Sequence, residues 1–378
     1  MREALRKLIR FSAIYGPRRA LFKAAGRLRF GRVSFFGIPH YAQPRDIGII
    51  GCGQFAFATI GYAIVTRFGK RIAACFDTDP RAAATLAQFY DAKNCKSADA
   101  IIGDPAIKYL YIASNHSTHA DYAIAALQAG KDVYVEKPIA VTTDQLQRLL
   151  AASDSSSGRL YAGYNRPFSP ALLELKSLCE RARGPLTLTC TVIGHTISRD
   201  HWYRDPAEGT RICGNLGHWL DLAVHIVSWR ERPRDWQISC RWSNAAEPDD
   251  NLAVTLTSSA GDLVSIVMTS RSEPFEGVLE TLTLQWADVI ASIDDFRSMT
   301  VRIGPRLIRK SYRPKNVGHV AAILQPFEGP VRDFREVVHS TEFMLAIAEM
   351  VRDGVQDIQF SLSEQPQDVF TAMRATCA

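Results

Sequence analysis

The sequence predicts an α/β domain with a parallel, doubly wound sheet, followed by an α+β domain with a large, mostly antiparallel sheet. Two observations predict this organisation. Between residues 46 and 164, short apolar strands alternate with helical segments, as in parallel sheets whose crossover connections are helices. After Gly163, strands of alternating polarity follow one another with turns between them, which is typical of antiparallel sheets that expose one face.

The composition is that of a globular protein of about two domains. The chain has 378 residues, of which 47% are hydrophobic and 22% are charged, and this excludes a disordered or fibrous protein. No apolar run reaches the roughly 20 residues that span a bilayer, and the first residues lack the apolar core of a signal peptide. The eight scattered cysteines include no C-x-x-C pair. We therefore expect reduced thiols in a cytoplasmic protein, and no metal site.

Residues 1–45 form a basic N-terminal extension. They hold 11 Lys or Arg and one acidic residue, whereas the remaining 333 residues hold 34 basic and 38 acidic groups. Two short amphipathic helices are predicted, separated by Gly16-Pro17, and their apolar faces are Leu5, Leu8, Ile9 and Ser12, then Leu21, Phe22, Ala25 and Leu28. Basic amphipathic helices bind anionic membranes, which would place the protein at the inner face of the membrane. Packing on the body or on a second subunit is the alternative, and no nucleic-acid motif accompanies the charge.

A glycine-rich turn follows the first predicted strand of the α/β domain. Residues 51–56 read G-x-G-x-x-A and open a helix that runs to about residue 68. In this pattern Gly51 permits a tight turn, Gly53 leaves room for a pyrophosphate, and the final alanine lets the helix pack closely on the strand. The N–H groups at the helix start, around Gln54 and Phe55, would then meet the phosphates.

An acidic residue ends the second predicted strand. Residues 71–76 form this strand, and Asp77 follows 24 positions after the second glycine of the turn. A carboxylate there accepts hydrogen bonds from both ribose hydroxyls and repels a 2′-phosphate, so NAD is favoured over NADP, a preference that the nearby Arg81 moderates. The alternative role for Asp77 is to cap the next helix, residues 81–90, although Asp79 before a proline is better placed for that.

A polar loop follows the strand at residues 109–113. We expect this loop, residues 114–119, to lie over the nicotinamide end of the cofactor, before a helix from about residue 120 to 130. The cofactor contacts expected from it are Ser114, Asn115, His116 and His119. The two histidines have the spacing of metal ligands, but no carboxylate or cysteine accompanies them, so hydrogen bonding within the loop is the favoured interpretation.

The tripeptide Glu136-Lys137-Pro138 ends the strand at residues 132–135. The carboxyl ends of strands are where open α/β sheets hold their ligands. A lysine at this position, in a domain that opens with a phosphate-binding turn, is therefore predicted to be a catalytic group beside a dinucleotide. Glu136 is expected at the same cofactor site.

The second half of the chain is predicted to be a sheet with helices. Its expected strands are residues 186–194, 251–258, 262–270, 279–285 and 289–293, with a helix at about 332–352. The solvent face of such a sheet needs a cover or a partner, so we expect a homo-oligomer formed through it. The predicted organisation is thus an extension (1–45), a dinucleotide-binding Rossmann domain (46–164) and a substrate-binding and oligomerisation domain (165–378).

Several motifs together resemble the glucose-fructose oxidoreductase / inositol dehydrogenase (Gfo/Idh/MocA) family of NAD(P)-dependent oxidoreductases. The resemblance covers roughly residues 46–378. It is carried by the turn at residues 49–53, the segment 126–138 and the segment 163–170. A further stretch, from Asp200-His201-Trp202 to residues 214–221, is similar to a subgroup found with polysaccharide-assembly enzymes.

The resemblance implies hydride exchange between a nicotinamide and a secondary alcohol of a sugar or a nucleotide sugar. Lys137 would hydrogen-bond the reacting oxygen and His218 would take its proton, because an unperturbed imidazole suits general-base work near neutral pH. The other implied contacts are Asn165, His201, Trp202 and Asn215 with the substrate, and Arg166 with the cofactor. Some of these have alternatives: Arg166 could pair with a structural carboxylate, His218 could be a packed helix residue, and His201 and Trp202 could form a subunit contact.

One position departs from the family's pattern. Many relatives have an aspartate four positions before the histidine, where this chain has Gly214, and Asp221, one turn after His218, is the candidate to replace it. The missing acid and the basic extension keep open a catalytically silent scaffold protein. A lyase or hydrolase with transient NAD oxidation is also open, since the same lysine and histidine would serve it.

Overall fold

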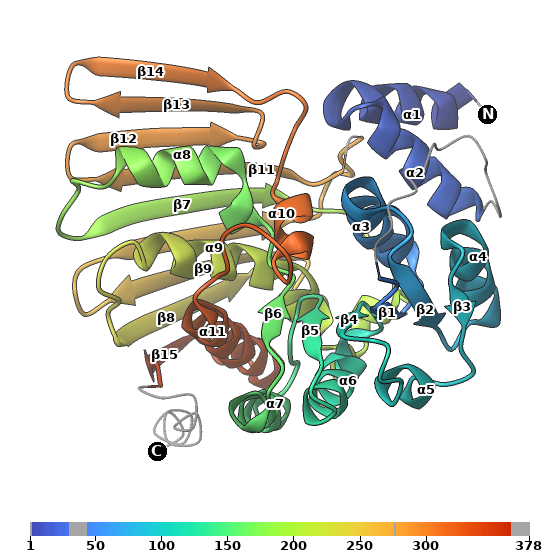
Figure 1. Cartoon of the computed structure of the whole chain (residues 1–378). Helices are drawn as coiled ribbons and strands as arrows, with labels where there is room; N and C mark the ends of the chain where they lie inside the picture. Colours follow the sequence, from blue (N-terminus) through green and yellow to red (C-terminus); the bar gives the residue numbers. More distant parts are fainter. Residues whose placement is uncertain (1, 30–43, 276, 364–378) are drawn as a thin grey trace. The chain divides into compact units, whose positions relative to one another are not determined.

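The computed structural model describes residues 2–29, 44–275 and 277–363. The chain forms two compact units. Unit 1 comprises residues 1–140, 144–164 and 319–334, and unit 2 comprises residues 141–143, 165–318 and 335–378. Each unit is built on one sheet, a six-stranded sheet in unit 1 and a nine-stranded sheet in unit 2 (Figure 1). Residues 30–43 of the predicted extension, and Cys377, lie outside the described part of the chain.

The sheet of unit 1 is parallel throughout, with the strand order β3-β2-β1-β4-β5-β6. Its strands are β1 (Ile47–Ile50), β2 (Ile72–Phe76), β3 (Lys93–Asn94), β4 (Tyr109–Ile112), β5 (Asp132–Val135) and β6 (Leu160–Ala162). The strand order reverses between β1 and β4, which is the switch point where doubly wound sheets bind their ligands. The four strands predicted for this half are confirmed, whereas β3 and β6 were not predicted.

Helices connect these strands, as the alternating pattern predicted (Figure 1). They are α3 (Gly61–Phe68), α4 (Pro80–Tyr90), α5 (Asp99–Ile102), α6 (His116–Gln128) and α7 (Thr143–Ser155). One late segment, α10 (His319–Leu324), also belongs to unit 1. It is held there by the Tyr111 hydroxyl, which donates to the carbonyl of Ile323 at 2.7 Å.

Two local expectations in this unit need correction. The helix after the glycine turn ends at Phe68 as predicted, but near its start it is a π-helix over Ala56–Ile60. Tyr90 explains this irregularity, because its hydroxyl donates to the carbonyl of Phe57 at 2.5 Å and so competes with the regular helical hydrogen bond. The second correction is that residues 116–119, expected in a loop, form the first turn of α6.

The sheet of unit 2 has the strand order β14-β13-β12-β11-β7-β10-β9-β8-β15. Only β7 and β10 pair in parallel, and the other neighbours are antiparallel. The strands are β7 (Leu186–Ile193), β8 (Asp235–Trp242), β9 (Asn251–Ser258), β10 (Leu263–Thr269), β11 (Leu279–Trp286), β12 (Val289–Asp294), β13 (Ser298–Ile303), β14 (Arg306–Ser311) and β15 (Asp357–Ser361). The five predicted strands are confirmed, and four more were not predicted.

Helices pack on one face of this sheet, and the other face is largely open. The helices are α8 (Pro170–Leu178), α9 (Gly217–Val227) and α11 (Phe334–Asp353), with short 3-10 turns at Arg166–Phe168, Trp202–Arg204 and Pro206–Glu208 and a π-turn at Ile212–Leu216. Phe343 of α11 contacts Trp236 of β8 edge-on, with the two ring centres 5.4 Å apart. On the open face, side chains such as Ile290, 53% exposed, and Val267, 40% exposed, lack an intrachain cover. Oligomerisation through this face stays a prediction.

Residues 2–29 form the N-terminal hairpin, with α1 (Arg2–Tyr15) and α2 (Pro17–Leu28) joined at Gly16 as predicted. Its apolar face differs from the predicted one. Phe22 and Ala25 are buried, but Leu21 and Leu28 are 52% and 62% exposed. The hairpin packs on the rest of unit 1 through α2. There the ring centres of Phe22 and Tyr62 lie 5.1 Å apart. Packing on the body is thus the alternative that the structure supports, and contact with a membrane stays a prediction. No helix among the described residues is long and apolar enough to cross a bilayer.

We expect Phe22→Ala to destabilise unit 1 by about 3–5 kcal/mol, because a fully buried aromatic ring is replaced by a cavity. Leu21→Ala, at the adjacent exposed position, is the matched control and should change the stability by less than about 0.5 kcal/mol. Chemical denaturation of the full chain measures both. Equal effects of the two substitutions would contradict the described packing of the hairpin.

Candidate functional site

The carboxyl edge of the unit 1 sheet brings together the turns that follow β1, β4 and β5. Gly51 makes the closest approach. It has a φ of +87°, and a Cβ atom placed on it would lie 2.4 Å from the backbone of Ala113 and Ser114. Any other residue at this position would push the glycine turn away from the loop after β4. The predicted requirement for glycine therefore has a specific cause, which is contact between the two loops.

Gly53 faces open space. A Cβ atom placed on it meets no described residue within 4 Å, so this part of the chain leaves room beside the backbone at the start of the helix. Gln54 and Phe55 occupy the first turn, and the Gln54 amide donates to the carbonyl of Lys23 in the N-terminal hairpin at 3.1 Å. An open backbone edge at a helix start is what the predicted pyrophosphate contact requires, and the contact itself stays a prediction.

Asp77 lies directly beside the glycine turn. Its Oδ2 accepts a hydrogen bond from the backbone N–H of Cys52 at 2.6 Å, and its Oδ1 accepts one from the N–H of Asp79 at 2.8 Å. The cap of α4 is Asp79, which accepts from the N–H of Arg81 at 2.9 Å. The structure thus assigns the capping role to Asp79, as favoured, and fixes the Asp77 carboxylate beside the glycine turn. Its contact with a ribose stays a prediction.

The segment after β4 is tied to the segment after β5 by His119. One ring nitrogen of His119 lies 2.8 Å from the carbonyl oxygen of Pro138 and the other lies 3.0 Å from that of Ser114. A neutral imidazole can donate to only one of these carbonyls. The Ser114 hydroxyl also bonds the hydroxyl of Thr118 at 2.8 Å. His119 and His116 are buried, and Asn115 lies at the N-terminus of α6. The hydrogen bonds of His119 and Ser114 agree with the favoured interpretation of this segment, which is hydrogen bonding within the loop.

Glu136 is a buried carboxyl next to the half-buried Lys137. Its Oε1 accepts from the Tyr134 hydroxyl at 2.7 Å. A Cβ atom on Gly163, at the end of β6, would lie 2.7 Å from this carboxyl group, so the glycine gives it room. Burial raises the pKa of Glu136 to about 7, partly offset by the Tyr134 hydrogen bond and the Lys137 charge. Lys137 itself stands at the carboxyl end of β5, on the same sheet edge as the glycine turn.

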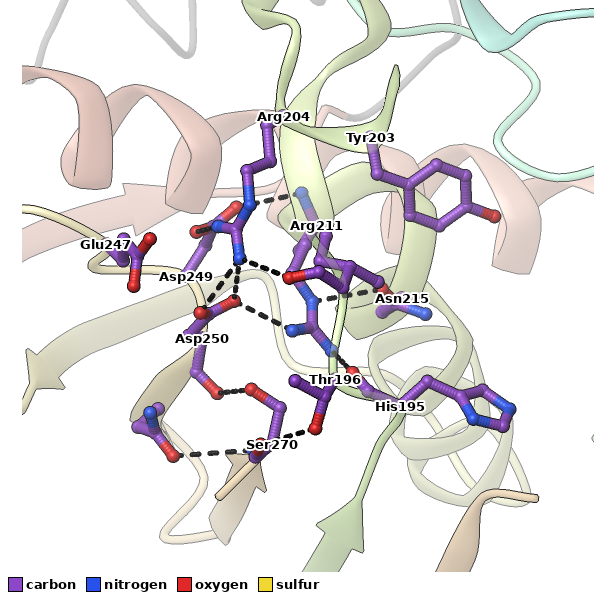
Figure 2. A network of polar contacts seen from close by, with 12 residues as sticks. His195, Thr196, Tyr203, Arg204, Arg211, Asn215, Glu247, Asp249, Asp250 and Ser270 are labelled. Atoms are coloured by element: carbon purple, nitrogen blue, oxygen red, sulfur yellow. Dashed lines mark hydrogen bonds and ion pairs between the residues drawn. The ribbon is translucent and has the colours of Figure 1, made fainter. Parts of the chain in front are cut away.

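Unit 2 contains a buried network of charges that the sequence did not reveal (Figure 2). Arg211, only 1% exposed, donates from Nη1 to Asp250 at 2.7 Å and from its backbone N–H to Asp249 at 3.0 Å. Arg204 donates to the same Asp250 carboxylate at 3.0 Å. Arg211 also donates to the carbonyl of His195 at 2.9 Å. These bonds fasten the segment from residue 195 to 216 to one acidic turn, and such buried pairs hold firmly because breaking one leaves an unpaired charge.

The network positions three of the predicted substrate residues. Asn215 receives a long hydrogen bond of 3.4 Å from Nε of Arg211, at the start of the helix that carries His218 (Figure 2). In the same fastened segment, the ring of His201 stacks on Trp202 at 6.0 Å, and Trp202 is 40% exposed. Burial lowers the pKa of His201, and the charges of Arg204 and Arg211 lower it further.

His218 lies half-buried near the start of α9, in unit 2. Its neighbour Trp219 is held by the Glu280 carboxylate, to which the indole N–H donates at 2.7 Å. Asp221 lies one turn further along α9 and is fully buried, and its Oδ1 accepts from the Ser340 hydroxyl of α11 at 3.3 Å. Gly214, at the position where the resemblance leads us to expect an acid, falls within the π-turn at Ile212–Leu216.

Asn165 and Arg166 make structural contacts within unit 2. The Asn165 amide donates to the carbonyl of Val317 at 2.5 Å. Arg166 forms a buried ion pair with Glu280, 2.6 Å from Nε to Oε2, and its guanidinium lies 4.6 Å from the ring centre of Trp219. The structural alternative for Arg166 is therefore observed, and its contact with a cofactor stays a prediction.

The described residues contain no cluster of three or more His, Cys, Asp or Glu side chains that could hold a metal ion. Seven of the eight cysteines are described, and all seven are buried free thiols. Burial raises the pKa of the thiols of Cys190 and Cys179 to about 12. These thiols are therefore poor nucleophiles and poor metal ligands near neutral pH.

Comparison with known proteins finds a family model that matches the first domain. Residues 45–164 match the Gfo/Idh/MocA family model, described as an oxidoreductase family with an NAD-binding Rossmann fold. Inositol 2-dehydrogenase 2 of Saccharopolyspora erythraea is 30% identical over 228 residues, which cover 58% of this chain and 65% of that protein. Inositol 2-dehydrogenase of Acidothermus cellulolyticus is 32% identical over 185 residues, or 47% of this chain and 51% of that protein. The chain thus spans about half to two thirds of the length of these relatives.

Solved structures share the fold of both units. The WlbA dehydrogenase from Bordetella pertussis, solved with NADH and UDP-GlcNAcA, matches with a TM-score of 0.67 at 22% identity, covering 85% of this chain and 100% of that one. GenD2 from gentamicin A biosynthesis, solved with NAD, matches with a TM-score of 0.69 at 16% identity, covering 86% and 99%. At these identities the likeness establishes the fold alone. The predicted fold class is confirmed.

We expect Asp77→Asn to weaken NADH binding by about tenfold, because an amide keeps the shape of the side chain but loses one acceptor oxygen and the charge. Fluorescence titration of the full chain with NADH measures the dissociation constant. Asp79→Asn is the matched control, because asparagine can still cap α4. It should leave the dissociation constant within about threefold of the parent. An unchanged affinity in Asp77→Asn would rule out its contact with ribose.

Glu136 should make stability depend on pH. Because its folded-state pKa is raised to about 7, the folded protein binds more protons than the unfolded chain between the ordinary carboxyl pKa and pH 7. Stability therefore falls as the pH rises through that window, by on the order of 3 kcal/mol from this group. Glu136→Gln should remove this part of the slope in denaturation curves from pH 4.5 to 7.5, whereas Glu180→Gln, at an exposed site, should not. Identical slopes in all three proteins would contradict the shift.

Proposed function

We propose that this protein is an NAD-dependent oxidoreductase that transfers hydride between a nicotinamide and a secondary alcohol or ketone of a sugar or nucleotide sugar. The observation that carries the proposal is the convergence on one sheet edge of the glycine turn after β1, the carboxylate after β2 and the lysine after β5. A Rossmann domain of an NAD-binding oxidoreductase family supports the cofactor, since residues 45–164 match that family.

The chain's own residues have distinct parts in holding the dinucleotide. The open backbone at Gly53 would receive the pyrophosphate, and Asp77 would bind the ribose hydroxyls of the adenosine half. Ser114 and His119, which join the turns after β4 and β5, would shape the nicotinamide end. When bound, the nicotinamide accepts or supplies the hydride, and the protein contributes orientation and charge.

Lys137 would stabilise the reacting oxygen. Its ammonium group offers a hydrogen bond and a positive charge to an oxygen that gains alkoxide character as hydride leaves the carbon. Glu136 supports this role through its protonation state. Its raised pKa of about 7 means that the buried carboxyl is about half ionised near neutral pH, so it offsets less of the lysine's charge than an ordinary carboxylate would.

His218 would accept the hydroxyl proton, as the resemblance implies. The bonds that hold Trp219 and Asn215 fix the backbone on both sides of this histidine, which supports a defined orientation of its ring. Asp221 replaces the missing acid at Gly214 only if its charge acts on the imidazole from one helical turn away, because its carboxylate already accepts from Ser340. We therefore assign the larger share of the oxygen chemistry to Lys137.

The names of related proteins support the substrate class. The two curated relatives described above are inositol 2-dehydrogenases, which by name act on a cyclic polyol, and the WlbA structure holds a nucleotide sugar. Both classes present secondary hydroxyl groups. Two side chains of the segment fastened by Arg211 would contact such a substrate. The half-buried Asn215 would hydrogen-bond its hydroxyls, and the exposed ring of Trp202 would pack on a sugar face.

A catalytically silent scaffold is the second candidate, and the specific observation that favours it is Gly214 at the position of the family's acid. The two candidates differ in what purified protein does with substrate. An oxidoreductase produces NADH in stoichiometric amounts with one of a panel of sugars, polyols and nucleotide sugars. A scaffold binds NADH and produces none. A lyase or hydrolase with transient oxidation converts the sugar without net NADH.

We expect Lys137→Met to lower kcat by about 10²–10³, because the oxygen loses a charged hydrogen-bond donor in the transition state. His218→Gln should lower kcat by about 10²–10⁴ and abolish the acidic limb of its pH profile. NADH affinity should stay within about threefold in both variants. Initial rates of NADH formation with the active substrate measure kcat, and Lys108→Met, at an exposed lysine of unit 1, is the control. Unchanged turnover in the first two variants would refute the catalytic assignment.

A further inference from the structure

The N-terminal hairpin reaches the phosphate-binding turn. The carbonyl of Lys23 in α2 accepts from the Gln54 side chain at 3.1 Å. At Gly26 the two segments touch so closely that an added Cβ atom would lie 2.9 Å from the Gln54 side chain and 3.0 Å from Phe57. The helix that carries the glycine turn is therefore lined on one side by the extension, which lies outside the residues 45–164 of the family match.

The hairpin ends in an arginine that bonds the glycine turn itself. Arg29 follows the last residue of α2 in the left-handed conformation, with a φ of 51°. Its Nη1 donates to the carbonyl of Cys52, between the two glycines, at 2.9 Å. The same nitrogen lies 3.5 Å from the hydroxyl of Thr85 on α4, and the guanidinium carbon lies 5.6 Å from the ring centre of Phe57.

Arg29 and Asp77 both bond the backbone of Cys52, one at its carbonyl and the other at its N–H. The N–H of Cys52 donates to the Asp77 carboxylate at 2.6 Å, and the carbonyl of Cys52 accepts from Arg29 at 2.9 Å. Asp77 marks the ribose end of a dinucleotide site, since it follows the second strand of the sheet. The contact of Arg29 with Thr85 places the guanidinium between the glycine turn and α4, the helix that follows Asp77. A positive and a negative group thus flank the same end of the site.

Among the residues that the structure describes, Arg29 donates only from Nη1, and its Nε and Nη2 donate to none of them. A guanidinium presents its donors in a planar fork that matches two oxygens of a phosphate. In Rossmann sites an arginine near the ribose accommodates the 2′-phosphate of NADP, whereas an acid at the end of the second strand favours NAD.

We propose that Arg29 is a cofactor-specificity residue that the N-terminal hairpin brings to the ribose end of the dinucleotide site. Its guanidinium donates hydrogen bonds to the 2′-phosphate of NADP and offsets the repulsion between this phosphate and Asp77. The protein therefore binds NADP as well as NAD. This inference rests on the proposed function, namely that unit 1 binds a nicotinamide dinucleotide. It also gives the extension a role in cofactor choice that is separate from its packing on the body.

The alternative is that Arg29 only fastens the hairpin to the turn. In that case its removal would affect NADH and NADPH alike, since the two cofactors share every group except the 2′-phosphate. The ratio of their dissociation constants therefore separates the two roles. A purely structural contact cannot move this ratio, whereas a contact with the 2′-phosphate must.

The test is fluorescence titration of the full chain with NADH and with NADPH, for the parent, Arg29→Gln and Arg29→Lys. In Arg29→Gln we expect the NADPH constant to rise by about tenfold or more, as for loss of a charge-assisted hydrogen bond, and the NADH constant to stay within about threefold. Arg29→Lys should recover part of the NADPH affinity. Arg27→Gln removes an exposed charge from the same helix and should leave the ratio unchanged.

Three outcomes would overturn the inference: an unchanged ratio in Arg29→Gln, an equal change in Arg27→Gln, or a parent protein that binds NADH but no NADPH. If the parent binds neither cofactor, the proposed function fails with it, and this result is distinct from the other three. Should Arg29→Gln unfold, Arg29→Met, which keeps apolar contact with Phe57, takes its place in the same comparison.

Discussion

The contact between the glycine turn and the loop after β4 is the constraint on which the rest of the site depends. At Gly51 the backbones approach so closely that a single Cβ atom would lie 2.4 Å from Ala113 and Ser114. This contact lies between neighbouring parallel strands at the switch point of the sheet. Because glycine allows this approach, the turn sits where the N–H of Cys52 reaches the Asp77 carboxylate and where the described residues leave the backbone at Gly53 open.

The second unit uses a different device for the same purpose. Three of its predicted substrate residues lie in a segment with little regular structure, which is fastened by Arg211 and Arg204 to the carboxylates of Asp249 and Asp250 (Figure 2). Glycine packing fixes the backbone in unit 1, and buried ion pairs fix it in unit 2. In both cases a rigid sheet supplies the frame, and the side chains that would act on ligands stand on the loops attached to it.

The sequence predicted features that depend on neighbouring residues. The glycine turn, the position of Asp77 and the strand before Lys137 were predicted because strand periodicity and turn chemistry are local. The π-helix at Ala56–Ile60 was not predicted, because it depends on the hydroxyl of Tyr90, which lies far along the chain. The partners of Arg211 were missed for the same reason, since nothing local pairs residue 211 with residue 250. Arg29 was counted only as part of a charged extension, because its contact with Cys52 exists only in the folded chain.

The most direct test of the central claim is a crystal structure of the full chain soaked with NAD. The account predicts a pyrophosphate against the backbone at Gly53, the adenosine ribose on the carboxylate of Asp77 and the nicotinamide beside Lys137. A dinucleotide bound elsewhere, or a site that stays empty at saturating NAD in a lattice that leaves this sheet edge accessible, would contradict it.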